Sequence, residues 1–278
     1  MHKNAKGETR SINLTVEGPV SVAGCTTREK IYEDNANRSF LIYLNESSEQ
    51  DKSVMDYQRR ISAGKVDFEE EVRLKEQFKN MQRILRPVKI INPYAEQLEI
   101  PEEVFKPRRT NNHYLQFIEA ITFYHQYQRE EKATEDGELY IETTLEDIAE
   151  ANKLMKEVLL RKSDELSGAC RKFFEELKKY LKKEERTDFT NTAIRKALRI
   201  NHSNQKRYMI ELQQEGFINK MKGDKKKGFY YEVLSMGEYE ELQRKINNVL
   251  DKVLEEVRSS QEVHRKNELD NTKKTNKK

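Results

Sequence analysis

The sequence predicts a mainly α-helical chain with small β elements, organised in two or three domains. First, apolar residues recur every three or four positions through most of the chain after Ser53, as on one face of a helix. Second, period-two alternation is confined to a few short runs, near the N-terminus and again between residues 217 and 233. Third, 36% of the 278 residues are charged, 35% are hydrophobic and none is Trp, which favours polar helices over a large core.

Residues 1–52 combine three short apolar runs with few other elements. We expect strands at Ser11–Val16, Val20–Cys25 and Phe40–Leu44, with a short helix near residues 28–35. No glycine-rich loop precedes these runs, and the sequence contains no G-x-x-x-x-G-K-[ST] phosphate-binding motif. Three strands are too few for an independent α/β domain. We therefore expect a truncated sheet, or one whose other strands lie elsewhere.

Residues 53–162 are predicted to form a helical domain. A helix over residues 53–85 is interrupted near residues 63–65 and ends before Pro87, because proline restricts the residue that precedes it. The next helix, Asn111–Arg129, carries a core-like stripe at helical spacing: Tyr114, Phe117, Ile118, Ile121, Tyr124 and Tyr127. Thr143 or Thr144 caps a third helix. Its inward side chains are expected to be Leu145, Ile148, Ala151, Leu154, Met155 and Val158.

Residues 163–236 show the order of elements found in a winged helix. One amphipathic helix is followed by two helices separated by a brief turn, and then by two alternating strands around a basic turn. Gly216 can adopt the left-handed conformation that ends the third helix. The predicted elements are Leu166–Leu181, Thr190–Leu198, Ser203 to about Glu215, Phe217–Lys222 and Phe229–Val233. This order predicts a C-terminal winged-helix DNA-binding domain.

Positive charge is concentrated on the same module. Residues 186–230 contain eleven Lys and Arg against four Asp and Glu, whereas the whole chain has a net charge of only +3. A phosphate-binding surface needs such a concentration, with helix side chains reaching the groove and hairpin side chains the backbone. The candidate DNA-binding residues are Arg195, Ser203, Asn204, Gln205, Lys206, Arg207, Lys225, Lys226 and Lys227. The alternative is a solvated basic surface on a protein–protein module.

The C-terminal residues fall into two segments. In residues 237–263, apolar side chains at heptad-like spacing predict an amphipathic helix that packs within the chain or pairs with a partner helix. These side chains are Tyr239, Leu242, Ile246, Val249, Val253 and Val257. Residues 264–278 contain six Lys and Arg against two acids and have no apolar core. We expect a disordered basic tail that adds nonspecific DNA affinity.

Composition disfavours several classes of protein. Cys25 and Cys170 are far apart in sequence and indicate no disulfide framework, so a reducing cytoplasm is the expected location. No apolar run approaches the roughly 20 residues that span a membrane, so no membrane partner is expected. The five histidines are scattered, and no Cys/His cluster has the spacing of metal ligands.

Two segments resemble parts of an AAA+ ATPase. The run VSVAGCTTREKIYEDNANRSFLIYL (Val20–Leu44) resembles the second half of the core, where a strand ends in a polar sensor-1 residue and an arginine precedes the last strand. Pro107–Met155 resembles the helical lid of minichromosome-maintenance-type helicases, with an arginine at the head of a long helix and then a capped T-x-E-D helix. Together, Gly7–Val233 is similar to the C-terminal part of primase-helicases of Bacteroides-type mobile elements, which end in a winged helix.

The resemblance implies roles for individual residues. Thr27 matches sensor 1, which orients the attacking water, and Arg38 matches the arginine finger, which stabilises charge on a phosphate bound by a neighbouring subunit. Arg109, or Arg108 in its place, matches sensor 2 at the head of the lid helix. Ser11–Val16 would correspond to a hairpin that points at DNA in ring helicases. Simpler roles compete: a strand-end hydroxyl for Thr27, and a structural ion pair for Arg38.

Neither Walker motif is present in this sequence. The resemblance therefore implies no cofactor and no enzyme activity of the chain's own; ATP and Mg²⁺ would enter only if an upstream ATPase or primase polypeptide supplied those motifs. The sequence thus predicts the DNA-binding C-terminal portion of a primase-helicase-like AAA+ replication protein, with DNA and such a polypeptide as partners and a homo-oligomer as one assembly. The alternative is a winged-helix transcription or replication-initiation regulator whose N-terminal region mediates dimerisation.

Overall fold

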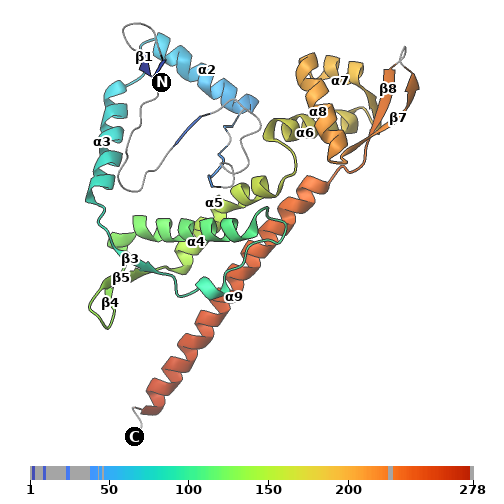
Figure 1. Cartoon of the computed structure of the whole chain (residues 1–278). Coiled ribbons are helices and arrows are strands. Elements are labelled where there is room, and N and C mark those ends of the chain that lie inside the picture. The colour runs from blue at the N-terminus through green and yellow to red at the C-terminus, as the bar shows by residue number, and fades with distance from the viewer. Residues whose placement is uncertain are drawn as a thin grey trace.

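The computed structural model describes residues 2–3, 9–10, 23–25, 38–42, 44–45, 47–224 and 228–275. These residues form a mainly helical molecule with small sheets of two or three strands, as the sequence predicts (Figure 1). Two units have separate hydrophobic cores, and a pair of helices that bury none of their residues precedes them. No helix in the described ranges is both long enough and apolar enough to cross a membrane.

The described residues of the N-terminal part include two short strands and two exposed helices. β1 (His2–Lys3) pairs antiparallel with β2 (Thr9–Arg10). α2 (Ser48–Ser62) and α3 (Phe68–Ile84) are joined by a turn in which Gly64 has a φ of +66°, at the interruption that the sequence predicts. Figure 1 shows both helices set apart from the two cores.

The strands expected in residues 1–52 are not formed where they can be examined. Ser11–Val16 lies outside the described residues. Residues 23–25 and 40–42 are described and belong to no strand, so the strand predictions are wrong there. The ring of Phe40 instead lies 5.3 Å from that of His113 on α4 (Pro107–Tyr124), measured between centroids. A short apolar run suits either a strand or a segment packed on a helix, and this contact selects the second.

Three helices from distant parts of the chain form the first core. α4, α5 (Leu145–Ser163) and the first half of α9 (Glu238–Thr275) pack together (Figure 1). Asn152 links them, because its amide oxygen accepts from Tyr114 Oη at 2.5 Å and its amide nitrogen donates to the carbonyl of Leu250 at 3.1 Å. The fully buried side chains include Tyr114, Ile118, Ile148, Leu159, Ile246 and Leu250.

A small sheet borders this core. β3 (Lys89–Ile91) pairs parallel with β5 (Leu139–Glu142), which pairs antiparallel with β4 (Lys132–Ala133), so the strand order is β3-β5-β4. Two short 3-10 helices, η1 (Ala95–Gln97) and η2 (Gln126–Gln128), lie in the connections.

A buried carboxylate fixes the start of α5. Thr144 caps this helix, as predicted, and forms a capping box with Asp147. The Asp147 side chain has no exposed surface, and it accepts hydrogen bonds from Arg129 Nη2 at 2.5 Å and from the backbone amide of Thr144 at 3.0 Å. Burial opposes the charged form, but these hydrogen bonds, with one to His125, hold the pKa of Asp147 below its ordinary value.

Acid should therefore remove the stability that Asp147 contributes. Because its folded-state pKa is lower than the unfolded value of about 3.9, the contribution is complete above that pH and is lost as the pH falls through the folded-state pKa. We expect Asp147→Asn to lower the free energy of unfolding at pH 7. The difference in this free energy between wild type and variant should become smaller below pH 4. Urea unfolding across this pH range measures it. Asp251→Asn, which removes an exposed carboxylate, is the control. A difference in the free energy of unfolding that does not change with pH would contradict the assignment of a stabilised Asp147 carboxylate.

The second core contains three helices and a three-stranded antiparallel sheet. The elements are α6 (Gly168–Lys183), β6 (Asp188–Thr190), α7 (Asn191–Ala197), α8 (His202–Gln214), β7 (Ile218–Asp224) and β8 (Gly228–Val233). The strand order is β6-β8-β7. The predicted helices and strands of residues 163–236 are confirmed to within a few residues, and β6 is an additional strand. Buried side chains of the core include Phe173, Phe174, Leu177, Leu181, Ile194 and Leu212.

A buried arginine joins the two units. Arg171 on α6 is 3% exposed, and its guanidinium donates to both carboxylate oxygens of Asp164, at 2.9 and 2.7 Å. Asp164 caps the C-terminus of α5, and Glu238, the first residue of α9, accepts from Arg171 Nη1 at 2.7 Å. The ring of Tyr239 lies 4.5 Å from the guanidinium. The ends of α5, α6 and α9 therefore meet at one charge cluster.

α9 is longer than predicted, and it packs within the chain instead of pairing with a partner helix. The helix packs within the chain, and it does so against α5 in the first core. It continues to Thr275, so residues 264–275 are helical and not disordered as predicted, while residues 276–278 lie outside the description. The sequence of α9 contains no Pro or Gly that would end a helix at residue 263.

Three side chains predicted to face the core are exposed. Tyr124 and Tyr127 are 54% and 53% exposed. Tyr124 is the last residue of α4, and Tyr127 lies in the 3-10 helix that follows, where the helical period of α4 no longer sets its direction. Leu154 on α5 is 54% exposed, whereas Asn152 is buried in its place by the hydrogen bonds that link α4 to α9.

Candidate nucleic-acid interface

Two side-chain caps and one cross-helix hydrogen bond set the position of α8. Thr190 Oγ1 accepts from the amide of Ala193 at the start of α7, and Asn201 Oδ1 accepts from the amide of Ser203 at the start of α8. In the turn between them, Arg199 has a φ of +50°. Gln205 Nε2 then donates to the carbonyl of Asn191 at 2.7 Å, so the N-terminus of α7 is tied to the second turn of α8.

One face of α8 is committed to the core. Tyr208, Met209 and Leu212 are buried, and the Tyr208 ring lies 5.4 Å from that of Phe173 on α6. Glu211 is also buried, and its carboxylate accepts from the backbone amide of Ser167 at 2.7 Å, at the N-terminus of α6. A carboxylate there is favoured by the helix dipole. These contacts fix both the direction of α8 and its rotation about its own axis.

The opposite face of α8 is exposed. Ser203, Lys206, Arg207, Ile210 and Gln214 recur at three and four residues, so they lie on one side of the helix and line a shallow groove along it. Ile210 is 45% exposed. This outward surface of α8 is polar and basic around a single aliphatic side chain.

Further cations lie on neighbouring elements of the same unit. Lys196 on α7, Arg199 in the turn and Lys220 on β7 are exposed. Lys220 Nζ lies 3.5 Å from the ring centroid of Phe229 on β8, which holds this ammonium over the hairpin. The turn between β7 and β8 includes Lys225, Lys226 and Lys227, which lie outside the described residues.

The structure separates the predicted DNA-binding residues into three groups. Ser203, Asn204, Lys206 and Arg207 are exposed on α8, as a contact surface requires. Arg195 is half-buried on α7. Gln205 was predicted to bond bases or phosphates, and this is wrong: its side chain is 2% exposed and its amide is occupied by Asn191. Its spacing explains the burial, because Gln205 lies three residues before Tyr208 and four before Met209, both in the core.

Sequence reasoning missed Ile210, Gln214 and Lys220. The signal for the first two was present in the helical period counted from Ser203, which reaches positions 206, 207, 210 and 214. An aliphatic residue such as Ile210 is more readily assigned to the core, and only the packing of α8 shows that it faces outward.

The residues implied by the AAA+ resemblance are only partly described. Thr27 lies outside the described residues. Arg38 is exposed in a turn, and Arg109 is exposed in the first turn of α4. Phe40, two residues after Arg38, packs on His113, one turn after Arg109, so the two segments lie against each other. Lys162 Nζ lies 3.1 Å from His113 Nδ1 in the same region. The sensor and finger roles remain predictions.

No group of His, Cys, Asp or Glu among the described residues is arranged to hold a metal ion. Comparisons with protein-family models, with curated proteins and with solved structures gave no significant match.

Proposed function

We propose that this chain binds duplex DNA, with α8 as the recognition helix of a winged helix. The observation that carries the proposal is the division of α8 into two faces. One face is locked into the second core, and the other presents Lys206 and Arg207 to solvent. The element order α6-β6-α7-α8-β7-β8 and the sheet order β6-β8-β7 support the winged-helix assignment, since a winged helix needs this order of helices and strands.

The dimensions and chemistry of α8 suit the major groove. Its 13 residues span roughly 20 Å at 1.5 Å per residue, and the groove, about 12 Å wide, admits one α-helix. Lys206 and Arg207 can donate to guanine edges or phosphates, while Ser203 and Asn204 lie at the positive end of the helix, where phosphates are favoured. Ile210 is placed for apolar contact with a thymine methyl group.

The β7–β8 hairpin would contact the DNA backbone beside this groove. Lys220 supports this role, and the three consecutive lysines of the turn supply further charge. Point charges on a hairpin add affinity without sequence preference.

For the larger protein, we propose the replication role that the resemblance implies: the DNA-binding end of a primase-helicase-like AAA+ protein. In this role the chain binds DNA, and ATP chemistry belongs to a polypeptide with Walker motifs. A second candidate, a winged-helix regulator that dimerises through its N-terminal region, is favoured by the apolar side chains that α2 and α3 leave exposed. A stable dimer on one palindromic site would separate the second role from the first.

The direct test is fluorescence anisotropy of the full chain with labelled duplex and single-stranded oligonucleotides over a salt series. We expect duplex binding that weakens with salt, with log Kobs falling by about 0.9 per phosphate contact for each unit of log salt. Replacing Lys225, Lys226 and Lys227 with Ser should flatten that slope by up to about 2.7 for three lost contacts. Absence of binding at low salt would refute the proposal and leave a protein–protein module.

A further inference from the structure

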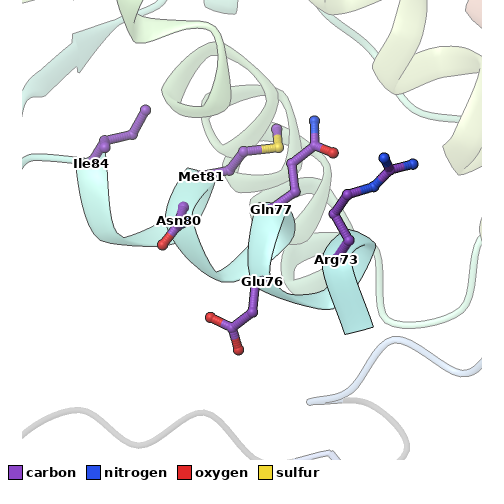
Figure 2. Close-up of a pocket in the computed structure, with 6 residues that line it drawn as sticks. All are labelled: Arg73, Glu76, Gln77, Asn80, Met81 and Ile84. Atoms are coloured by element: carbon purple, nitrogen blue, oxygen red, sulfur yellow. The ribbon is translucent and has the colours of Figure 1, made fainter. Parts of the chain in front are cut away.

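α3 exposes a continuous apolar side. Leu74, Phe78, Met81 and Ile84 recur at four and three residues and are 44%, 65%, 50% and 59% exposed. Figure 2 shows Met81 and Ile84 projecting from one side of the helix with Gln77 and Arg73, while Glu76 and Asn80 point the other way. Monomeric proteins rarely expose large continuous apolar patches, and such patches mark interaction sites.

The C-terminal end of α3 and the residues that follow it are attached to α4 and η2 beside the first core. Gln82 Nε2 donates to Tyr124 Oη at 3.1 Å, Tyr127 Oη donates to the carbonyl of Ile84, and the amide of Arg86 donates to Gln126 Oε1 at 3.2 Å. None of its 17 residues is buried against any described part of the chain. The helix is thus held in place while its apolar side stays uncovered by described residues.

The charges of α3 are divided along its length. Residues 67–71 contain four acids and no base, whereas residues 72–86 contain five Lys and Arg and one acid. Two parallel copies of such a helix would place like charges together. Two antiparallel copies place the acidic end of each beside the basic end of the other and also align their dipoles favourably.

We propose that α3 pairs antiparallel with α3 of a second copy of this chain, burying Leu74, Phe78, Met81 and Ile84 about a two-fold axis. A surface that is complementary to itself when reversed is what a two-fold interface requires. α2 also exposes apolar side chains at helical spacing, namely Val54, Tyr57 and Ile61. The proposal does not depend on DNA binding by α8.

The first test is sedimentation velocity on the full chain across a concentration series. We expect a monomer–dimer equilibrium for wild type, and a monomer for Phe78→Asp/Met81→Asp at the same concentrations. The control is Leu154→Asp, which places a single negative charge at another exposed apolar position on a helix and should leave the dimer intact; the single variant Phe78→Asp is its match in charge and should be monomeric. A monomeric wild type would overturn the proposal, as would a double variant that still dimerises. If wild type is monomeric and Phe78→Asp has a lower melting temperature than wild type, the chain's own residues cover this side of α3.

The second test asks whether the charges of α3 direct the pairing, as distinct from apolar association alone. One variant carries Glu69→Lys, Glu70→Lys and Glu71→Lys, and the other carries Lys75→Glu, Lys79→Glu and Arg83→Glu. Each alone should be monomeric, because both ends of its antiparallel pair then repel. Mixing them should restore a dimer of one copy of each, detected by native mass spectrometry. Circular dichroism checks that both variants retain wild-type helix content. Folded variants that fail to form the mixed dimer would overturn the antiparallel arrangement.

Discussion

Replacing both Lys206 and Arg207 with Ala is expected to weaken binding of the full chain to duplex DNA by at least about tenfold. Both side chains are exposed on the outward side of α8, and a lost base contact costs about 1–3 kcal/mol, where 1.4 kcal/mol corresponds to tenfold. The same variant should keep the wild-type melting temperature, because neither side chain belongs to the core. Anisotropy titrations at fixed salt measure the first effect and thermal unfolding the second.

The control for this prediction removes the same charge elsewhere. Lys252→Ala/Arg258→Ala takes two exposed cations from α9, in the part of that helix that packs on the first core. If general electrostatic attraction accounts for binding, both double variants will lose affinity equally, and the assignment of α8 will be wrong. If only the α8 variant loses affinity, the contact surface is localised to the second unit.

Arg171→Ala is expected to lower the free energy of unfolding by about 3–5 kcal/mol, the cost of breaking a buried ion pair on one side. The substitution leaves Asp164, whose side chain is 2% exposed, without its two hydrogen bonds, and it removes the cation from the ring of Tyr239. Burial disfavours the charge of Arg171, but its bonds to Asp164 and Glu238 raise its pKa above the ordinary value, so the guanidinium stays charged at neutral pH. Equilibrium urea unfolding gives the change.

Arg186→Ala provides the comparison, since its partner Asp188 is partly exposed and such pairs contribute at most about 1 kcal/mol. A similar small loss for Arg171→Ala would mean that water or another cation compensates Asp164, and that the cluster does not fix the junction. Because Arg171 touches both units, we expect its loss to uncouple them, so that tyrosine fluorescence and circular dichroism give transitions that coincide for wild type and separate for the variant.

Helix positions and their caps could be predicted from local sequence. Thr144, Thr190 and Gly216 perform the capping and stop roles that their residue types suggest, because those roles depend on neighbours within four positions. The apolar period of Leu166–Leu181 likewise predicted an amphipathic helix, and Phe173, Phe174 and Leu177 form the buried side of α6. Such features need no knowledge of the rest of the chain.

Features that depend on distant partners could not be predicted. β6 has only three residues and becomes a strand by pairing with β8, some forty residues later. Leu154 was predicted to face the core and is exposed, while Asn152 is buried by a hydrogen bond to the Leu250 carbonyl of α9, a partner 98 positions away. The apolar run Phe40–Leu44 predicted a strand, but the ring of Phe40 packs against His113 on α4.

The candidate site was predicted in outline and corrected in detail. Lys206 and Arg207 follow from charge concentration and position in the helix, and both are exposed. Gln205 has the chemistry of a base-reading side chain, yet its use in the protein is set by rotation about the α8 axis, which depends on Met209 and Leu212 filling the core. Composition identifies which residues can bind DNA, and packing decides which of them are free to do so.

The charge cluster at Arg171 also bears on the order in which the chain folds. The second unit is inserted between α5 and α9, which are joined by a hydrogen bond that spans 98 positions in sequence. Joining two such distant helices directly costs loop-closure entropy, and contacts of this range slow folding. If the inserted unit folds first, its two ends, Asp164 and Glu238, are drawn to the same guanidinium, and the loop that α5 and α9 must close becomes short. The second unit would then serve as the template on which the other core assembles.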